Sequence, residues 1–391
     1  MALQYRDFKV RQRPVRPARA LPDQLPERTR DDIERAKGLL AQDFKGVTSD
    51  GIVAGGLFSI EETGIPTAGI KHAADAVLDS LSVSQRKAST FPIDSDVWRH
   101  WSNIHPFLMR HGALLEDMNI AQRELVLGLM KECLSPSGFE LASNIMRLNE
   151  SIREITGSDE ELGEWLYWLS IMGKPSHDEP WGWQIDGHHL IVNCFNLGDQ
   201  LVMTPMFMGS EPVAVDTGKY AGTRVFQAEE QTGLNLAQTF TSDQRRKAII
   251  AEDLPGELFT AAFRDNFELR PEGIRYDELT SHQQAILIDL IGVYVNRLPS
   301  GHAQAKLDEV TRHLQETCFA WMGGTEEESV FYYRVHSPVI LIEFDHQGGI
   351  ALESDGPSHN HIHTVVRTPN GNDYGKDLLR QHHQQYSHSH R

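Results

Sequence analysis

The sequence has few cysteines, and none of them lies in a pattern that builds a covalent or metal framework. The three cysteines, Cys133, Cys194 and Cys318, lie far apart and form no Cys-x-x-Cys pair. An odd and scattered set argues against a disulfide framework or a thiolate zinc site. It is typical of small buried side chains in a reducing compartment. We therefore expect a cytoplasmic protein.

Positive charge and long apolar runs are also scarce. The 391 residues include 37 Lys plus Arg against 55 Asp plus Glu, which gives a formal net charge of −18. This acidic balance argues against a protein that binds nucleic acid or an anionic membrane surface. No apolar run approaches the roughly 18 residues that span a bilayer, and the N-terminus has no apolar export signal. We expect a small-molecule ligand as partner and leave a homodimer open.

Several familiar catalytic motifs are missing as well. The chain has no glycine-rich phosphate loop, no Gly-x-Ser-x-Gly elbow and no His-Glu-x-x-His helix. Nucleotide-dependent, serine-hydrolase and zincin chemistry therefore become poor explanations.

The N-terminal stretch is basic although the chain as a whole is acidic. It carries several arginines, and its prolines prevent a continuous helix. We expect an extended arm that packs on the acidic body or on a second subunit. An organellar transit peptide is the alternative.

A helix-start pattern recurs four times, with an apolar residue, then Ser, Asn or Thr, then Gln three positions later. The capping residues are Ser82, Asn119, Thr241 and Thr280. Each side-chain oxygen can accept from first-turn amides while the Gln reaches back, so each copy should begin a helix. The sequences that follow do not align at a fixed period. We interpret the pattern as a repeated capping solution and not as an internal repeat.

Two segments, 164–215 and 318–367, are instead rich in aromatic and β-branched residues. Asp186-Gly187 should close a hairpin in the first, because this dipeptide tolerates positive φ. Short connections predict antiparallel pairing, and the two segments should join into one sheet. We predict an α+β fold with a mostly antiparallel sheet, a meander of about seven or eight strands, packed against and flanked by helices.

This pattern predicts a single domain between two appended segments. We expect a basic extended arm at 1–27, one α+β domain at 28–386 and a disordered tail at 387–391. The expected parts of the domain are a helical part at 28–157, the first β segment at 164–215, a helical insert at 240–316, the second β segment at 318–367 and a last helix at 376–385.

The clearest chemical signal is the pair His361 and His363. Residues two apart on a strand share a face, so these imidazoles could chelate one metal if a carboxylate approached from a neighbouring strand. Glu343 and Asp345 have the same spacing and should emerge opposite the apolar side of their strand. The alternative is that all four are solvated residues at strand ends.

A second candidate is Gly187-His188-His189. Adjacent strand residues point to opposite faces, so only one of these histidines can join a given site, and the pattern does not choose between them. The candidate residues are, as metal ligands, His188, His361 and His363; as catalytic residues, Glu343, Asp345 and His189; and as substrate-binding residues, Trp183, Trp321, Tyr333, Arg334 and Arg367. Such aromatic side chains are more often core residues than ligand platforms.

Several motifs together resemble a known family. The matching stretches include Trp181-Gly182-Trp183, Gly187-His188-His189-Leu190, Tyr332-Tyr333-Arg334, Leu341-Ile342-Glu343 and Asn360-His361-Ile362-His363. They resemble an uncharacterised bacterial and fungal family, domain of unknown function 3500, over residues 67–385. The resemblance implies one co-folding unit and brings no activity.

The residues themselves predict a metal-dependent enzyme that acts on a small organic molecule. A divalent Zn, Fe or Mn ion would polarise a carbonyl or activate water, which indicates hydrolase or lyase chemistry. A metal-dependent oxidoreductase or oxygenase, or a non-enzymatic small-molecule binding protein with an aromatic-lined pocket, stays open as an alternative.

Overall fold

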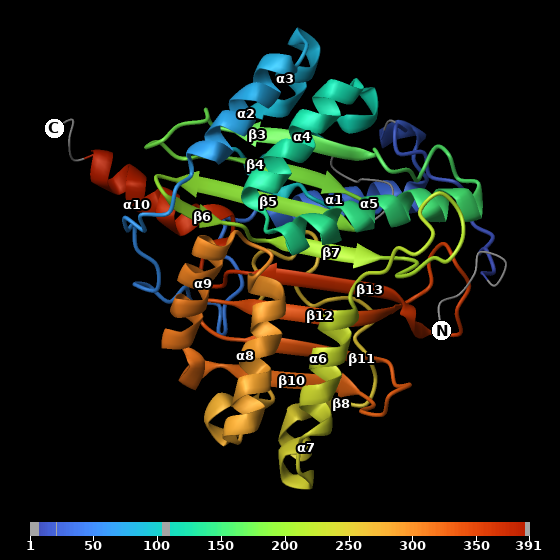
Figure 1. Cartoon of the computed structure of the whole chain (residues 1–391), viewed down its shortest axis with the longest axis vertical. Helices are drawn as coiled ribbons and strands as arrows, with labels where there is room; N and C mark the ends of the chain where they lie inside the picture. The colour runs from blue at the N-terminus through green and yellow to red at the C-terminus, as the bar shows by residue number, and fades with distance from the viewer. Residues whose placement is uncertain (1–7, 21, 104–109, 388–391) are drawn as a thin grey trace.

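The computed structural model describes residues 8–20, 22–103 and 110–387. Within them, 13 strands form one sheet in the order β1-β3-β4-β5-β7-β13-β12-β11-β10-β8, with β2 on β3, β6 on β5 and β9 on β10 (Figure 1). The strands are β1 (Thr90–Phe91), β2 (Ala113–Leu114), β3 (Tyr167–Met172), β4 (Trp181–Gly187), β5 (Leu190–Leu197), β6 (Gln200–Val202), β7 (Met206–Ser210), β8 (Ile249–Ala251), β9 (Ile274–Arg275), β10 (Cys318–Gly323), β11 (Phe331–His336), β12 (Leu341–Gly348) and β13 (Pro357–Arg367).

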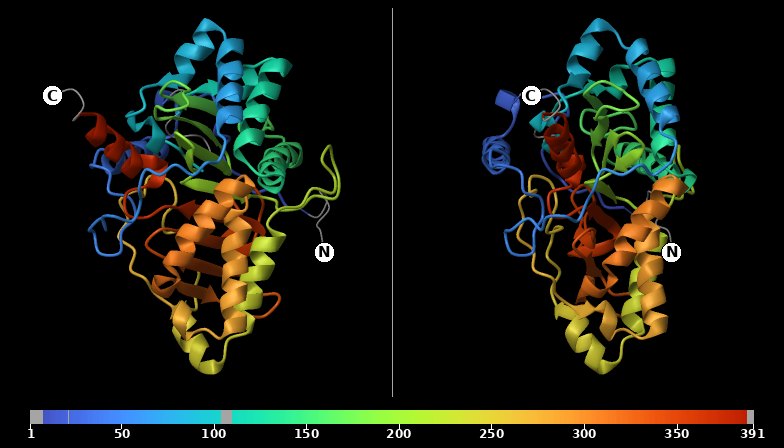
Figure 2. Two further views of the ribbon diagram at one scale, coloured as in Figure 1. Left: turned by 60° about the vertical axis from the view of Figure 1, so that its left-hand side comes forward. Right: turned by 90° about the vertical axis from the view of Figure 1, so that its left-hand side faces the viewer.

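Helices cover one side of this sheet in two groups. Helices α2, α4 and α5 lie over the strands from β3 to β7, and α6, α8 and α9 lie over those from β10 to β13, while α1, α10 and long irregular segments lie on the other side (Figure 2). The helices are α1 (Glu27–Leu40), α2 (Ala68–Ser80), α3 (Val83–Ser89), α4 (Ile120–Cys133), α5 (Pro136–Thr156), α6 (Gln227–Gln238), α7 (Ser242–Ala248), α8 (Ser281–Val295), α9 (Ser300–Arg312) and α10 (Lys376–Ser387).

The α+β class is confirmed, but the predicted meander of about seven or eight mostly antiparallel strands is wrong. β1 pairs with β3 in parallel, and so does β8 with β10, which makes the sheet mixed. The strands that the prediction missed are only two or three residues long, too short for an alternating pattern to show. The expected union of the two β segments is confirmed, because β7 pairs with β13.

The sheet has two halves that are built alike, one with strands β1 to β7 and one with strands β8 to β13. In each half a capped short helix, α3 or α7, leads directly into the short parallel strand β1 or β8. A second capped helix in each half, α4 or α8, carries a glutamine that links it to the first. Gln122 of α4 donates to the backbone carbonyl of Ser80 and to the side chain of Gln85. Gln283 of α8 donates in the same way to the carbonyl of Thr239 and to the side chain of Gln244.

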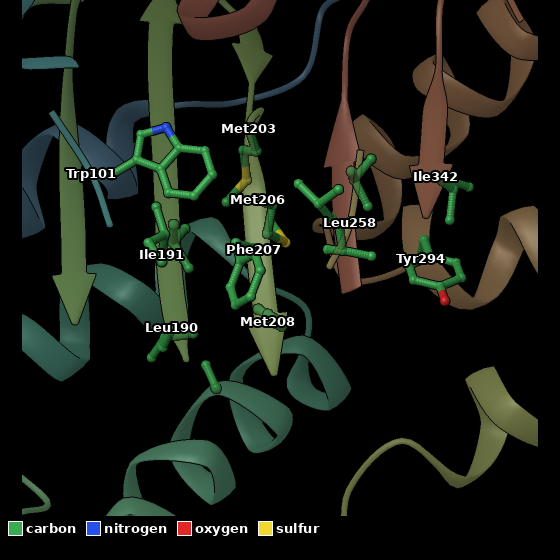
Figure 3. Close-up of a cluster of buried hydrophobic side chains, with 14 of the residues drawn as sticks. Trp101, Leu190, Ile191, Met203, Met206, Phe207, Met208, Leu258, Tyr294 and Ile342 are labelled. Atoms are coloured by element: carbon green, nitrogen blue, oxygen red, sulfur yellow. The ribbon is translucent and has the colours of Figure 1, made fainter. Parts of the chain in front are cut away.

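The four caps therefore form two pairs of the same kind, Ser82 with Asn119 and Thr241 with Thr280. The interpretation of the pattern as a repeated capping solution, and not an internal repeat, stays a prediction. β7 and β13 meet at the junction of the halves, where Met206 pairs with Val366. Side chains from both halves, among them Ile191, Phe207 and Ile342, form one hydrophobic cluster across this junction (Figure 3).

The hairpin between β4 and β5 turns later than predicted. Asp186 and Gly187 belong to β4, Gly187 pairs with Leu190, and the turn consists of His188 and His189. Gly187 is required for packing, because a Cβ there would lie 2.0 Å from Cδ1 of Tyr167. The prediction that Asp186-Gly187 closes the hairpin is wrong, since the dipeptide pattern does not distinguish a turn glycine from a glycine in a tight contact.

The basic arm packs on the body of the same chain. Arg13 forms an ion pair with Glu161, and Val10 forms an isolated bridge with Leu352 in the segment after β12. Residues 1–7 and 21 of the expected arm and residues 388–391 of the expected tail lie outside the described residues. Over the described part of the chain, none of the helices combines the length and apolar character that crossing a membrane requires.

Candidate metal centre

Three histidines converge on the side of the sheet that faces the irregular segments. His361 Nε2 lies 3.2 Å from His189 Nε2 and 3.1 Å from His363 Nε2. His189 comes from the turn after β4, and the other two come from β13. All three are buried, with exposed fractions of 5%, 2% and 5% for His189, His361 and His363.

The backbone around the three rings is adapted to bring them together. His189 has a φ of 63°, in the left-handed region that residues other than glycine rarely adopt and that is often found at functional sites. Gly209, opposite His363 on β7, leaves room for the rings. A Cβ at Gly209 would lie 2.9 Å from Cδ2 of His363 and 3.1 Å from Cδ2 of His189.

Hydrogen bonds on the far side of two rings set their tautomers. His361 Nδ1 donates to the carbonyl of Gly348 at 2.8 Å, and His363 Nδ1 donates to Glu257 Oε1 at 3.0 Å. Both partners can only accept, so in the neutral rings each Nδ1 carries the proton and each Nε2 presents a lone pair. With both rings in this form, two lone pairs face each other at 3.1 Å, an arrangement that a cation between them would stabilise.

The spacing of the rings also fits a metal. Tetrahedral zinc binds imidazole nitrogen at about 2.0–2.1 Å, which places neighbouring ligand nitrogens about 3.3 Å apart. The Nε2 separations of 3.1 and 3.2 Å are close to that value. The three ligand atoms all lie within 4.8 Å of one another.

Burial favours the neutral imidazole at His361. Burial lowers the pKa of His361 to about 4, although the nearby Glu211 carboxylate opposes that effect. Glu211 also accepts from the backbone amides of Ile350, Ala351 and Leu352, which fixes the segment after β12 beside the site. Neutral imidazole is the form that binds a metal.

Two carboxylates near His363 have opposite protonation behaviour. Burial alone would raise the pKa of Glu257, but its contact with His363 and its hydrogen bond from the backbone amide of Leu258 outweigh burial and lower the pKa. Asp345 lies opposite His363 on β12, where burial and the charges of Glu257 and Glu343 raise its pKa to about 9. Its Oδ2 accepts from Gln347, and its Oδ1 has no hydrogen-bond partner among the described residues. Burial and the two neighbouring carboxylates thus favour the neutral acid form of Asp345.

Glu343 lies outside the three-histidine group. Its Oε2 accepts from the amide of Phe259 at 2.8 Å and the hydroxyl of Tyr332 at 2.7 Å. Its Oε1 accepts from the amide and hydroxyl of Thr260. With both oxygens engaged and no exposure, Glu343 anchors the irregular segment that also carries Glu257.

His188 is also outside the ligand group, because Nδ1 bonds to Asn149 Oδ1 at 2.8 Å and the ring stacks on His189. The expectation that adjacent residues alternate between faces does not apply here, since both histidines lie in the turn and not in a strand. The structure therefore places His189, and not His188, with His361 and His363.

The five candidate substrate-binding residues are buried inside the fold. Trp183 Nε1 donates to Cys133 Sγ, and Trp321 stacks on Phe331 and Tyr333. The hydroxyl of Tyr333 lies 2.6 Å from that of Tyr294. Arg334 pairs with Glu272, and Arg367 pairs with Asp265 and Asp373. These contacts hold the sheet to its helices and loops, and the predicted role in substrate binding stays a prediction.

Sequence reasoning missed Glu257, Glu211 and Gly209. Glu257 and Glu211 lie outside helices and strands, so no periodicity marks them. The signal at Gly209 was its position inside a strand, next to the last residue of β7, because glycine in a strand often indicates close approach of other groups.

Comparison with known proteins gives a family and no activity. No curated protein and no solved structure matches the chain. A family model matches residues 63–376, which is most of the chain, and this confirms the resemblance seen in the sequence. The protein belongs to the family described as "Protein of unknown function (DUF3500)".

Proposed function

We propose that this protein is a metal-dependent enzyme whose divalent ion binds to Nε2 of His189, His361 and His363. The observation that carries the proposal is the pair of Nε2 lone pairs that face each other at 3.1 Å while both Nδ1 atoms are committed to acceptors. Such an arrangement costs energy without a cation between the rings, and a metal ion satisfies all three nitrogens.

The ligand set favours hydrolase or lyase chemistry over oxygen chemistry. Three neutral imidazoles leave a fourth position open on a tetrahedral ion, whereas iron oxygenases commonly use two histidines and one carboxylate. A zinc-type ion in this setting would polarise a carbonyl and lower the pKa of water to about 7.

Asp345 is the residue that we assign to proton transfer. Burial and neighbouring carboxylates raise its pKa, and it lies opposite a ligand histidine, so it can donate a proton to a leaving group and later recover it. Glu257 has a positioning role, because its carboxylate orients His363 and increases the basicity of that ring.

The enclosure of the site favours a small substrate. The three histidines are almost completely buried, while the side chain of Glu257 is 30% exposed. Access from the side of Glu257 suits a small organic molecule better than a polymer.

The direct test is metal analysis of tag-free protein purified without added metal. We expect His361→Ala and His363→Ala to lose one equivalent of metal relative to the wild type. His302→Ala, which removes another buried histidine far from β13 in the sequence, is the matched control and should retain it. Circular dichroism shows whether each variant is folded. Folded His361→Ala protein with the wild-type metal content would refute the proposal.

A further inference from the structure

A second group of metal-type ligands lies apart from the three histidines. Glu230 Oε1 is 2.9 Å from His346 Nε2 and 2.5 Å from His359 Nδ1. The three ligand atoms lie within 4.8 Å of one another. We propose that Glu230, His346 and His359 bind a second divalent cation of the zinc type, which joins the first turn of α6 to β12 and β13.

The second group lies on the opposite side of the sheet from the first. Successive residues of β12 point to opposite faces, so His346 faces away from Asp345 and from the site beside it. His346 contacts Glu230 of α6, one of the helices that cover the other side of the sheet (Figure 1). The register shifts between His346 and Gly348, and His359 packs edge-on against His346 with ring centroids 4.6 Å apart. The two groups share no ligand.

His346 is held in position for binding. The ring is fully buried and contacts Phe331 and Phe344 edge-on, with centroids 4.5 and 5.0 Å away. Its Nδ1 lies 3.0 Å from the nitrogen and 3.1 Å from the oxygen of Phe331. Either tautomer of His346 is therefore hydrogen-bonded without movement of the ring, and Nε2 can release its proton to bind a metal.

The remaining ligands leave room for solvent. The side chains of Glu230 and His359 are 27% and 40% exposed, so a water molecule can reach the fourth position of a tetrahedral ion. His359 Nε2 lies 3.3 Å from the carbonyl of Glu328, which orients the ring with Nδ1 toward Glu230. Two imidazoles and a carboxylate form a common ligand set for zinc.

The role of this ion is structural. Of the three ligands, Glu230 comes from a helix, α6, while His346 and His359 come from β12 and β13, the two strands beside the first site. His359 precedes His361 by two residues, so an ion here fixes the part of β13 that leads into the proposed catalytic ligands. Binding should raise thermal stability and need not involve a substrate.

The test is titration of metal-stripped, full-length, tag-free protein with Zn²⁺, followed by calorimetry and by thermal melting. We expect two equivalents for the wild type and one for His359→Ala and Glu230→Gln. His359 is partly exposed, so its replacement should leave the fold intact. Glu328→Gln is the matched control, because Glu328 contacts His359 only through its carbonyl, and this variant should keep two equivalents.

The two proposals fail in different ways. If the first site binds no metal, the wild type binds one equivalent that His359→Ala loses and His361→Ala keeps. Zn²⁺ should also raise the melting temperature of His361→Ala protein but not that of the His359→Ala, His361→Ala double variant. Metal stoichiometry that is the same in the wild type, His359→Ala and Glu230→Gln would overturn the second site.

Discussion

Replacing Glu343 by Gln separates an anchoring role from a catalytic one. The carboxylate accepts four hydrogen bonds, two at each oxygen, from Phe259, Thr260 and Tyr332. An amide would place an NH₂ group where two donors now point. Each hydrogen bond to a charged group contributes about 1.5–3 kcal/mol, so the loss of two costs about 3–6 kcal/mol.

That cost is a large share of the roughly 5–15 kcal/mol that stabilises a typical domain. We therefore expect the urea midpoint of Glu343→Gln to fall sharply while the protein that remains folded keeps its metal. Equilibrium urea denaturation with metal analysis of the folded fraction measures both quantities. The control is Glu268→Gln, an exposed carboxylate on the same irregular segment, which should match the wild type.

The opposite pattern would refute this reasoning. If Glu343→Gln unfolds within about 1 kcal/mol of the wild type but loses metal or activity, Glu343 acts on the chemistry and the anchoring role is wrong.

Three further predictions concern Glu257, Gly209 and His336. Glu257→Gln should weaken metal binding about 10- to 100-fold with little change in the urea midpoint, since it removes the charge that orients His363; competition with a chelator measures this, and unchanged affinity would contradict it. Gly209→Ala should lower metal affinity, because its Cβ would lie 2.8 Å from the Ile362 carbonyl, whereas Gly128→Ala, with open space around its Cβ, should not. Burial and the charge of Arg334 lower the pKa of His336 to about 3, so its neutral form stabilises the fold above pH 6.5. That stability is lost as the pH falls, by about 2 kcal/mol between pH 6.5 and 5, and a folded His336→Phe variant should lose correspondingly less in urea titrations at each pH.

The sequence predicts best the features that depend on neighbouring residues. The four capped helices form where expected because a cap needs only a hydroxyl or amide oxygen and a glutamine three residues later. The rings of His361 and His363 lie together, as expected, because strand alternation is also local. Glu257 comes from a segment without periodicity, and its proximity to His363 depends on the anchor at Glu343, which only the folded chain reveals.

The sequence left His188 and His189 as alternatives for a different reason. Alternation presumes that both residues lie in a strand, yet the turn falls on these two histidines. The side chain of Tyr167, distant in sequence, fills the space beside Gly187. Glycine is therefore needed at this position for packing and does not mark the turn. A contact between strands thus decided which histidine became a candidate ligand.

The similarity between the two halves of the sheet gives an independent reason to regard Glu343 as structural. In the first half, Gln184 pairs across strands with Asn193, and in the second half Arg334 pairs with Glu343 at the same place. Asn193 also anchors a loop, by donating to the carbonyl of Pro205 at 2.7 Å. A polar anchor at this position is thus common to both halves. His188 and His189 are not, since the equivalent turn between β11 and β12 consists of Ser337, Pro338, Val339 and Ile340. The halves thus share the polar anchor to which Glu343 belongs and differ at the turn that carries His189, which favours His189 over Glu343 as a residue of the proposed metal site.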